Sequence, residues 1–157
     1  MYEDVIMPEG VNNETLEHLM DPKNYGKIED ANCIGVALDE KTGEYVIFYS
    51  NLQDNIIKNA SYATNGCQDT VVIGSMFSEM IIGNDTQYAQ GAIQKMHEKL
   101  GKLSTQQQVC ADIVFSGFVA SMLNFDHLAE GKEEDMHVIK MKDSCEGENQ
   151  INGEKSE

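Results

Sequence analysis

Three segments decide the fold class: Cys33-Ile-Gly-Val-Ala-Leu38, Tyr45-Val-Ile-Phe-Tyr-Ser50 and Ile56-Ile-Lys-Asn-Ala-Ser-Tyr-Ala-Thr64. Each segment is short and rich in β-branched and aromatic residues, as strands are. The linkers Asp-Glu-Lys-Thr-Gly and Leu-Gln-Asp-Asn contain the residue types that tight turns favour. The pattern predicts a three-stranded antiparallel meander.

Apolar residues recur at helical spacing in the sequence before and after the three predicted strands. After Cys67, the residues Val72, Met76 and Met80 follow at intervals of four until Gly83 interrupts the pattern. The predicted helices cover residues 14–20, the stretch from Cys67 to Gly83, 86–91, 92–100 and 106–125. Helices packed on one face of an antiparallel sheet form an α+β architecture.

The length of the chain, 157 residues, fits one domain, which we place at residues 14–128. Residues 1–13 form an N-terminal extension and residues 129–157 an acidic tail. We expect the tail to be disordered, because its charged and small residues offer little apolar surface to offset the entropy of ordering. Its one apolar segment, His137-Val-Ile-Lys-Met141, could dock as a short strand.

Charge and hydropathy argue against several classes of partner. The 27 acidic residues against 11 basic ones give a net charge of −16, the wrong sign for a nucleic-acid-binding surface. We find neither an uninterrupted apolar run of the roughly 18 residues that a membrane span needs nor a basic segment typical of a secretion signal. We therefore expect a cytoplasmic protein without membrane contact, whose four dispersed cysteines are reduced.

Two cysteines are the strongest candidates for a site. Cys67 and Cys110 each lie where a loop leads into a predicted helix, in Thr-Asn-Gly-Cys67-Gln-Asp and Gln-Gln-Val-Cys110-Ala-Asp-Ile. The free N–H groups and partial positive charge of a helix N-terminus lower a thiol's pKa, and the thiolate can bind metal or accept sulfur. Cys33 falls on an inward strand position, where we expect simple packing and only a weak claim to metal binding. Cys145 lies in the tail.

Several short motifs occur in order along the chain. The stretch His18-Leu-Met-Asp-Pro22-Lys-Asn24-Tyr-Gly26 is followed by Asp30-Ala-Asn32, Gly43-Glu44, Gly66-Cys67 and Cys110. In their order and spacing these motifs resemble the IscU-like, NifU N-terminal scaffolds on which iron–sulfur clusters are assembled. The resemblance covers roughly residues 14–125 and implies the fold of that family.

The resemblance also implies a site. Cys67 and Cys110 match ligand positions for iron or a nascent [2Fe-2S] cluster, and Glu44 stands where the family has an aspartate that tunes cluster lability. The family's Cys-Gly-Asp turn is here Thr42-Gly43-Glu44, and its His-Cys pair is Val109-Cys110. One thiolate and one imidazole are thus replaced. Zinc is a possible alternative metal.

Other family positions bear on partners and on the histidines. The Leu-Pro-Pro-Val-Lys stretch that bacterial members offer to an Hsp70-type chaperone is replaced by Leu103-Ser-Thr-Gln-Gln107, which argues against chaperone-assisted cluster release. His18 matches the family's opening helix, so we expect it to be structural. The remaining histidines, His97, His127 and His137, match no ligand position.

Three functions are open at this point. The first is a scaffold-like assembly protein without turnover of its own, which accepts sulfur from a cysteine desulfurase, at Cys110 by the family match, and serves an apo iron–sulfur protein. The second is a degenerate paralogue without a cluster, which binds or regulates the desulfurase or another scaffold. The third is a zinc-binding sulfurtransferase partner, although the short stretch from Ile57 to Cys67 lacks the insertion of that class. A homodimer could pool four thiolates for a cluster.

Overall fold

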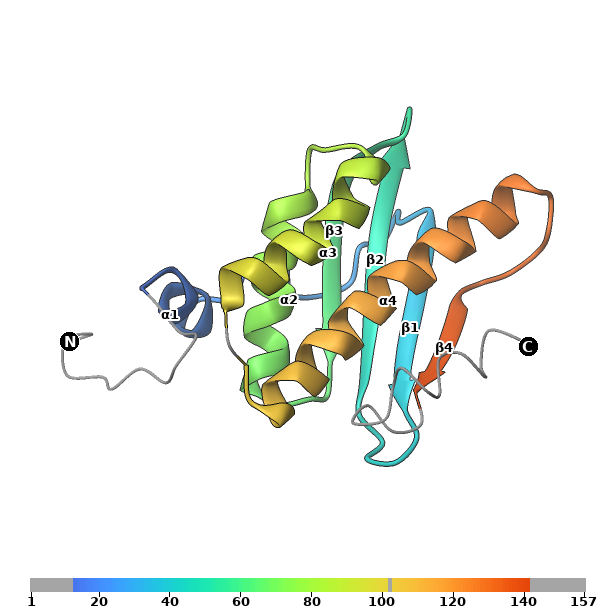
Figure 1. The fold of residues 1–157 in the computed structure, drawn as a ribbon. Coiled ribbons are helices and arrows are strands. Elements are labelled where there is room, and N and C mark those ends of the chain that lie inside the picture. The colour runs from blue at the N-terminus through green and yellow to red at the C-terminus, as the bar shows by residue number, and fades with distance from the viewer. Residues whose placement is uncertain (1–12, 102, 142–157) are drawn as a thin grey trace.

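The computed structural model describes residues 13–101 and 103–141, arranged as one sheet and a layer of helices (Figure 1). The elements in chain order are α1 (Asn13–Met20), β1 (Cys33–Asp39), β2 (Tyr45–Gln53), β3 (Ile56–Thr64), α2 (Gln68–Ile81), α3 (Thr86–Leu100), α4 (Thr105–Ala129) and β4 (His137–Met141). The α+β class and the antiparallel meander predicted from the sequence are therefore confirmed.

The sheet has four strands rather than the three that we predicted. Its order is β3-β2-β1-β4, in which β2 pairs antiparallel with both β1 and β3, and β4 pairs parallel with β1. The added strand pairs its residues His137–Met141 with Gly35–Asp39. The short apolar segment docks because the edge of β1 offers unpaired backbone groups to it. Of the acidic tail predicted at residues 129–157, the part up to Met141 is therefore ordered, and residues 142–157 lie outside the described residues.

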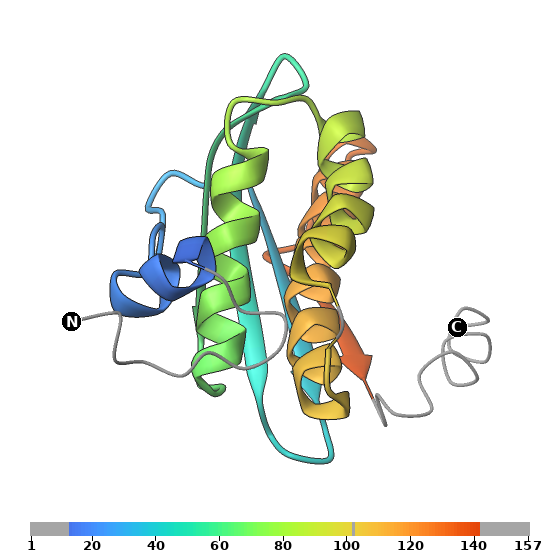
Figure 2. The ribbon, with the colours of Figure 1, turned by 60° about the vertical axis from the view of Figure 1, so that its left-hand side comes forward.

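Helices α2, α3 and α4 cover one face of the sheet (Figures 1 and 2). The core between the layers contains edge-to-face contacts of Phe77 with Phe48 and with Phe118. Helix α4 approaches β1 so closely that a Cβ on Gly35 would lie 2.0 Å from the backbone nitrogen of Ser121. Only glycine allows this approach, which fixes α4 across the sheet.

Helix α3 is continuous, whereas we predicted two pieces divided near Gly91. Its N-cap Asp85 accepts a hydrogen bond from the Tyr88 N–H, and it runs to Leu100. Gly91 is exposed within this helix, where glycine costs about 1 kcal/mol relative to alanine but does not break the helix. The buried residues Ala89, Ala92 and Met96 anchor the helix on either side of it.

Helix α4 is long and apolar enough to cross a membrane by length and hydropathy, the one such helix among the described residues. Its sequence contains no uninterrupted apolar run of that length, because polar residues such as Ser116 and Ser121 lie within it. In the fold 61% of its most apolar window is buried against the rest of the protein. Helix α4 is thus the central core helix.

Candidate metal centre

Cys67 occupies the N-cap position of α2, as the sequence predicted. Its extended backbone ends the loop after β3, and its carbonyl accepts hydrogen bonds from the N–H groups of Thr70 and Val71. The thiol is exposed. A cap position directs the free N–H groups of the first helical turn toward a side chain placed there.

Cys110 lies in the second turn of α4 rather than at its start, contrary to the prediction. The helix begins at Thr105, and Ser104 is its N-cap, joined to Gln107 in a reciprocal capping box. The backbone N–H of Cys110 therefore belongs to the helix interior and offers no free charge to the thiol. The Cys110 side chain is buried, with only 1% of its surface exposed.

The fold nevertheless brings the two thiols together. Cys67 Sγ and Cys110 Sγ lie 3.2 Å apart although the residues are 43 positions apart in sequence, and both thiols are free. Gln106 Nε2 donates to Cys110 Sγ at 3.6 Å, and the Thr70 hydroxyl lies 3.8 Å from Cys67 Sγ. Packing of α2 on α4 thus creates a site with one open and one enclosed sulfur.

Burial and hydrogen bonding separate the pKa values of the two thiols. Partial burial alone would raise the pKa of Cys67, but hydrogen bonds from the Thr70 N–H and from Cys110 outweigh it, and the net pKa lies below the ordinary value. Burial raises the pKa of Cys110 to about 12. Cys67 is therefore the more readily ionised of the two thiols, and Cys110, whose pKa is raised, is placed to donate toward it.

A carboxylate completes a group of three donors. One ligand atom each from Cys67, Asp69 and Cys110 lies within 4.8 Å of the others. Asp69 was not among the predicted ligands, and Glu44, which was, does not belong to this group. The signal for Asp69 was its position two residues after Cys67, where a helix N-terminus favours an acidic side chain.

The turn that carries Thr42 and Glu44 adjoins the loop before Cys67. Asn65 joins them, because its Oδ1 accepts from Tyr45 N–H at 2.8 Å and its Nδ2 donates to the Gly43 carbonyl at 3.2 Å. The Thr42 hydroxyl accepts from the Glu44 N–H at 3.2 Å. The two loops therefore meet at one end of the sheet (Figure 1), while a ligand role for Glu44 stays a prediction.

The remaining candidates lie elsewhere. Cys33 is buried in the core, where its thiol faces the Ser50 carbonyl at 3.6 Å and burial raises its pKa to about 12, so packing is its evident role. His97 contacts the Phe115 ring, with ring centroids 5.2 Å apart. Cys145 lies outside the described residues.

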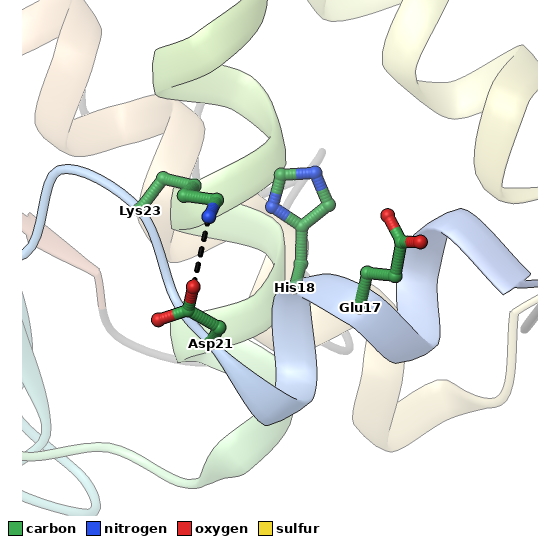
Figure 3. Close-up of a pocket in the computed structure, with 4 residues that line it drawn as sticks. All are labelled: Glu17, His18, Asp21 and Lys23. Atoms are coloured by element: carbon green, nitrogen blue, oxygen red, sulfur yellow. Dashed lines mark hydrogen bonds and ion pairs between the residues drawn. The ribbon is translucent and has the colours of Figure 1, made fainter. Parts of the chain in front are cut away.

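His18 has the structural role that we predicted. Its Nδ1 lies 2.6 Å from the Ser75 hydroxyl, which also accepts from the Lys23 N–H, and these contacts fasten α1 to α2. His18 lines a pocket of about 260 Å³ together with Glu17, Asp21 and Lys23. Figure 3 shows these side chains and the ion pair of Asp21 with Lys23. None of these residues was predicted as a ligand, and the pocket is separate from the thiol group.

The chain is similar in sequence to proteins described as iron-sulfur cluster assembly scaffolds. The iron-sulfur cluster assembly scaffold protein IscU of Aquifex aeolicus is 31% identical over 105 residues, which cover 65% of this chain and 67% of the relative. The corresponding protein IscU 1 of Archaeoglobus fulgidus is 26% identical over 114 residues, covering 72% of this chain and 74% of the relative.

A solved structure and a family match extend the comparison. The structure is of a candidate iron-sulfur cluster assembly scaffold protein for the SUF system from Fervidobacterium islandicum AW-1, with a TM-score of 0.50 and 18% identity. The alignment covers 74% of this chain and 94% of that one, which supports the fold. The match to the NifU-like N terminal domain spans residues 11–129. The chain therefore belongs to the NifU-like N-terminal domain family.

Proposed function

We propose that this protein is a scaffold for iron–sulfur cluster assembly, which holds iron or a nascent [2Fe-2S] cluster as its cargo. The observation that carries the proposal is the 3.2 Å approach of Cys67 Sγ to Cys110 Sγ across two helices. The relatives described as cluster assembly scaffolds support it. The protein acts by binding and release rather than by turnover, and we place it in the cytoplasm.

The donor set suits a cargo that must later leave. Thiolates are soft ligands that favour iron–sulfur clusters, whereas a carboxylate binds iron more weakly and exchanges more readily. The enclosed Cys110 retains the cargo, and the open Cys67 and Asp69 give a recipient apo protein access to it. A fourth donor must come from outside this group, either from Glu44 across the adjoining turn or from a second copy of the chain.

Sulfur delivery requires a nucleophilic thiolate on this protein. A thiolate here attacks the terminal sulfur of a persulfide on a cysteine desulfurase, a new S–S bond forms, and the desulfurase cysteine leaves as its thiolate. The reaction exchanges one persulfide for another and needs no external oxidant or reductant. Exposure and a lowered pKa favour Cys67 as the first acceptor, whereas the family match favours Cys110.

Persulfide labelling tests the proposal and identifies the acceptor. The full chain is incubated with a purified cysteine desulfurase and cysteine, and persulfides are located by alkylation and mass spectrometry. We expect label at Cys67 in the parent and in Cys110→Ser, and its loss in Cys67→Ser. Cys33→Ser, which changes a buried core thiol, is the matched control and should leave labelling unchanged. Label confined to Cys110 would assign the acceptor role to the enclosed thiol, and no label at either residue would refute sulfur acceptance.

A second function is favoured by the turn at Thr42. A threonine hydroxyl is a poor iron ligand, and the donor group contains two thiolates and one carboxylate where a cluster needs four donors. On this account the chain is a relative that binds the desulfurase or another scaffold without carrying a cluster. A binding assay between purified, metal-free protein and desulfurase, combined with failure to hold iron, would favour this function over the first.

A further inference from the structure

A second group of potential ligands lies at the other end of α4. His127 is in the last turn of that helix, Glu134 is in the following loop, and His137 is the first residue of β4. The Glu134 carboxylate faces both imidazoles, with Oε1 2.8 Å from His127 Nδ1 and Oε2 3.1 Å from His137 Nδ1. The two rings lie with their centroids 5.1 Å apart.

A buried amide holds the carboxylate in place. Asn124 is only 1% exposed, and its Nδ2 donates to Glu134 Oε1 at 3.0 Å and to the Glu134 carbonyl at 3.2 Å. Its Oδ1 accepts from the Ile34 N–H of β1 at 2.8 Å. Hydrogen-bonded support of this kind commonly orients carboxylate ligands in metal sites, because it fixes the oxygen atoms before an ion arrives.

The geometry and charge of the group suit a transition-metal cation. One donor atom from each of its three residues lies within 4.8 Å of the others, and an ion about 2.0–2.2 Å from each donor fits once the side chains adjust by about 1 Å. The side chains of His127 and Glu134 are 25% and 26% exposed, which leaves room for water at the remaining coordination positions. The acidic residues of the loop, Glu130, Glu133 and Asp135, add negative charge nearby.

This group cannot share an ion with the thiols. A straight α-helix rises about 1.5 Å per residue, so α4 advances about 25 Å from residue 110 to residue 127. The two groups also differ chemically, since one offers sulfur and the other imidazole nitrogen. Imidazoles suit zinc, iron and copper, and two imidazoles with one carboxylate form a donor set known for divalent iron and zinc.

We propose that His127, Glu134 and His137 bind a divalent first-row transition ion, such as Zn²⁺ or Fe²⁺, at a site independent of the thiol pair and of the proposed scaffold function. The ion takes the place of the protons that bridge the two Nδ1 atoms and the carboxylate. A neutral imidazole then carries its one proton on Nε2, and a protonated imidazole releases one proton to solvent. By joining α4, the loop and β4, the ion fastens the edge strand to the sheet.

Titration with Co²⁺ and Zn²⁺ tests the site in the full chain carrying Cys67→Ser and Cys110→Ser. We expect one equivalent to bind, with cobalt d–d absorption but no thiolate charge-transfer band, and an upward shift of Tm with Zn²⁺. Adding His127→Gln or His137→Gln should weaken binding at least tenfold. The matched control is His97→Gln, a histidine outside the group, which should leave affinity unchanged.

X-ray absorption spectroscopy of the bound Zn²⁺ identifies the neighbouring atoms of the ion without any histidine substitution. Scattering from imidazole nitrogen and oxygen alone is the expected result, whereas sulfur neighbours would place the ion elsewhere and overturn the proposal. The proposal also fails when the folded parent variant binds no ion, or when the His127→Gln and His137→Gln variants bind as tightly as the His97→Gln control.

Discussion

The two ends of α4 carry two donor groups that arise in different ways. Near its start, Cys110 meets Cys67 of α2, so the thiol pair depends on how two helices pack over a long sequence separation. Near its end, His127 meets Glu134 and His137 through a short reversal of the chain and the pairing of β4 with β1. One rigid helix thus separates a sulfur-rich group from a nitrogen-rich one, and each can be disturbed alone.

The largest expected effect comes from a substitution that disturbs both donor groups of α4 together. Gly35→Val places a side chain against the α4 backbone, where even a Cβ would lie 2.0 Å from the Ser121 nitrogen and 2.5 Å from the Gly117 carbonyl. Since α4 must move off β1, we expect destabilisation of about 3 kcal/mol or more, measured by denaturant unfolding. Gly91→Ala is the control: its exposed site has nothing within 4 Å, so it should stabilise the protein by about 0.5–1 kcal/mol.

Two asparagine substitutions test whether the region of the histidine group and the region of the thiol pair respond independently. Asn124→Ala leaves the Ile34 N–H without its acceptor and frees the Glu134 carboxylate, which should cost about 1–3 kcal/mol and speed hydrogen exchange in β4. Asn65→Ala should cost less, because Asn65 is exposed, and should speed exchange in the turn at residues 40–45. Equal effects of both variants on β4 would show that the two ends are not independent.

The two thiols should differ in reactivity within their shared site. Because Cys67 is exposed with a lowered pKa, whereas Cys110 is buried with a raised one, we expect iodoacetamide to modify Cys67 at least about tenfold faster at neutral pH. Peptide mass spectrometry of timed samples measures both rates. Similar rates would mean that Cys110 is accessible and that α2 and α4 separate readily at this end.

The smallest expected effect is a pH response at the histidine end. Hydrogen bonds from Asn124, His127 and His137 outweigh partial burial and lower the pKa of Glu134 to about 2, from an ordinary value of 4.5. A lowered carboxyl pKa stabilises the fold above the unfolded value, so this contribution is present above about pH 4.5 and is lost as pH falls toward 2. Acidification through this range should weaken the attachment of β4 to the sheet in the parent protein. In Glu134→Gln, which lacks the titrating carboxyl, this response to pH should be smaller.

The sequence predicted most of the sheet and one half of the thiol site well. The strand predicted at Ile56–Thr64 has those bounds in the structure, because a dense run of β-branched and aromatic residues is a local signal. We placed the residues of β4 in the acidic tail. These five residues form a strand only because they pair with the free edge of β1. That partner is distant in sequence, and the histidine group that it creates was therefore missed.

The errors at the thiol site have equally specific causes. The helix predicted at residues 106–125 already began ahead of Cys110, and the capping box of Ser104 and Gln107 fixes its start there, so the placement of Cys110 at a helix start was wrong. Cys110 is buried because α4 packs on the sheet, and a local sequence pattern does not reveal such packing. The family resemblance pointed to the turn at Glu44 and not to Asp69, whereas the helix that Cys67 begins places the Asp69 carboxylate near the sulfur.

Anaerobic reconstitution with iron and sulfide is the decisive test of whether the thiol pair holds a cluster. The full chain is compared with Cys67→Ser, Cys110→Ser and with His127→Gln, His137→Gln, which alters the opposite end of α4. We expect visible iron–sulfur absorption and bound iron and sulfide in the parent and in the histidine variant, and their loss in the cysteine variant while its fold is retained. A folded parent that holds no iron and sulfide, or a cysteine variant that holds as much as the parent, would contradict this expectation.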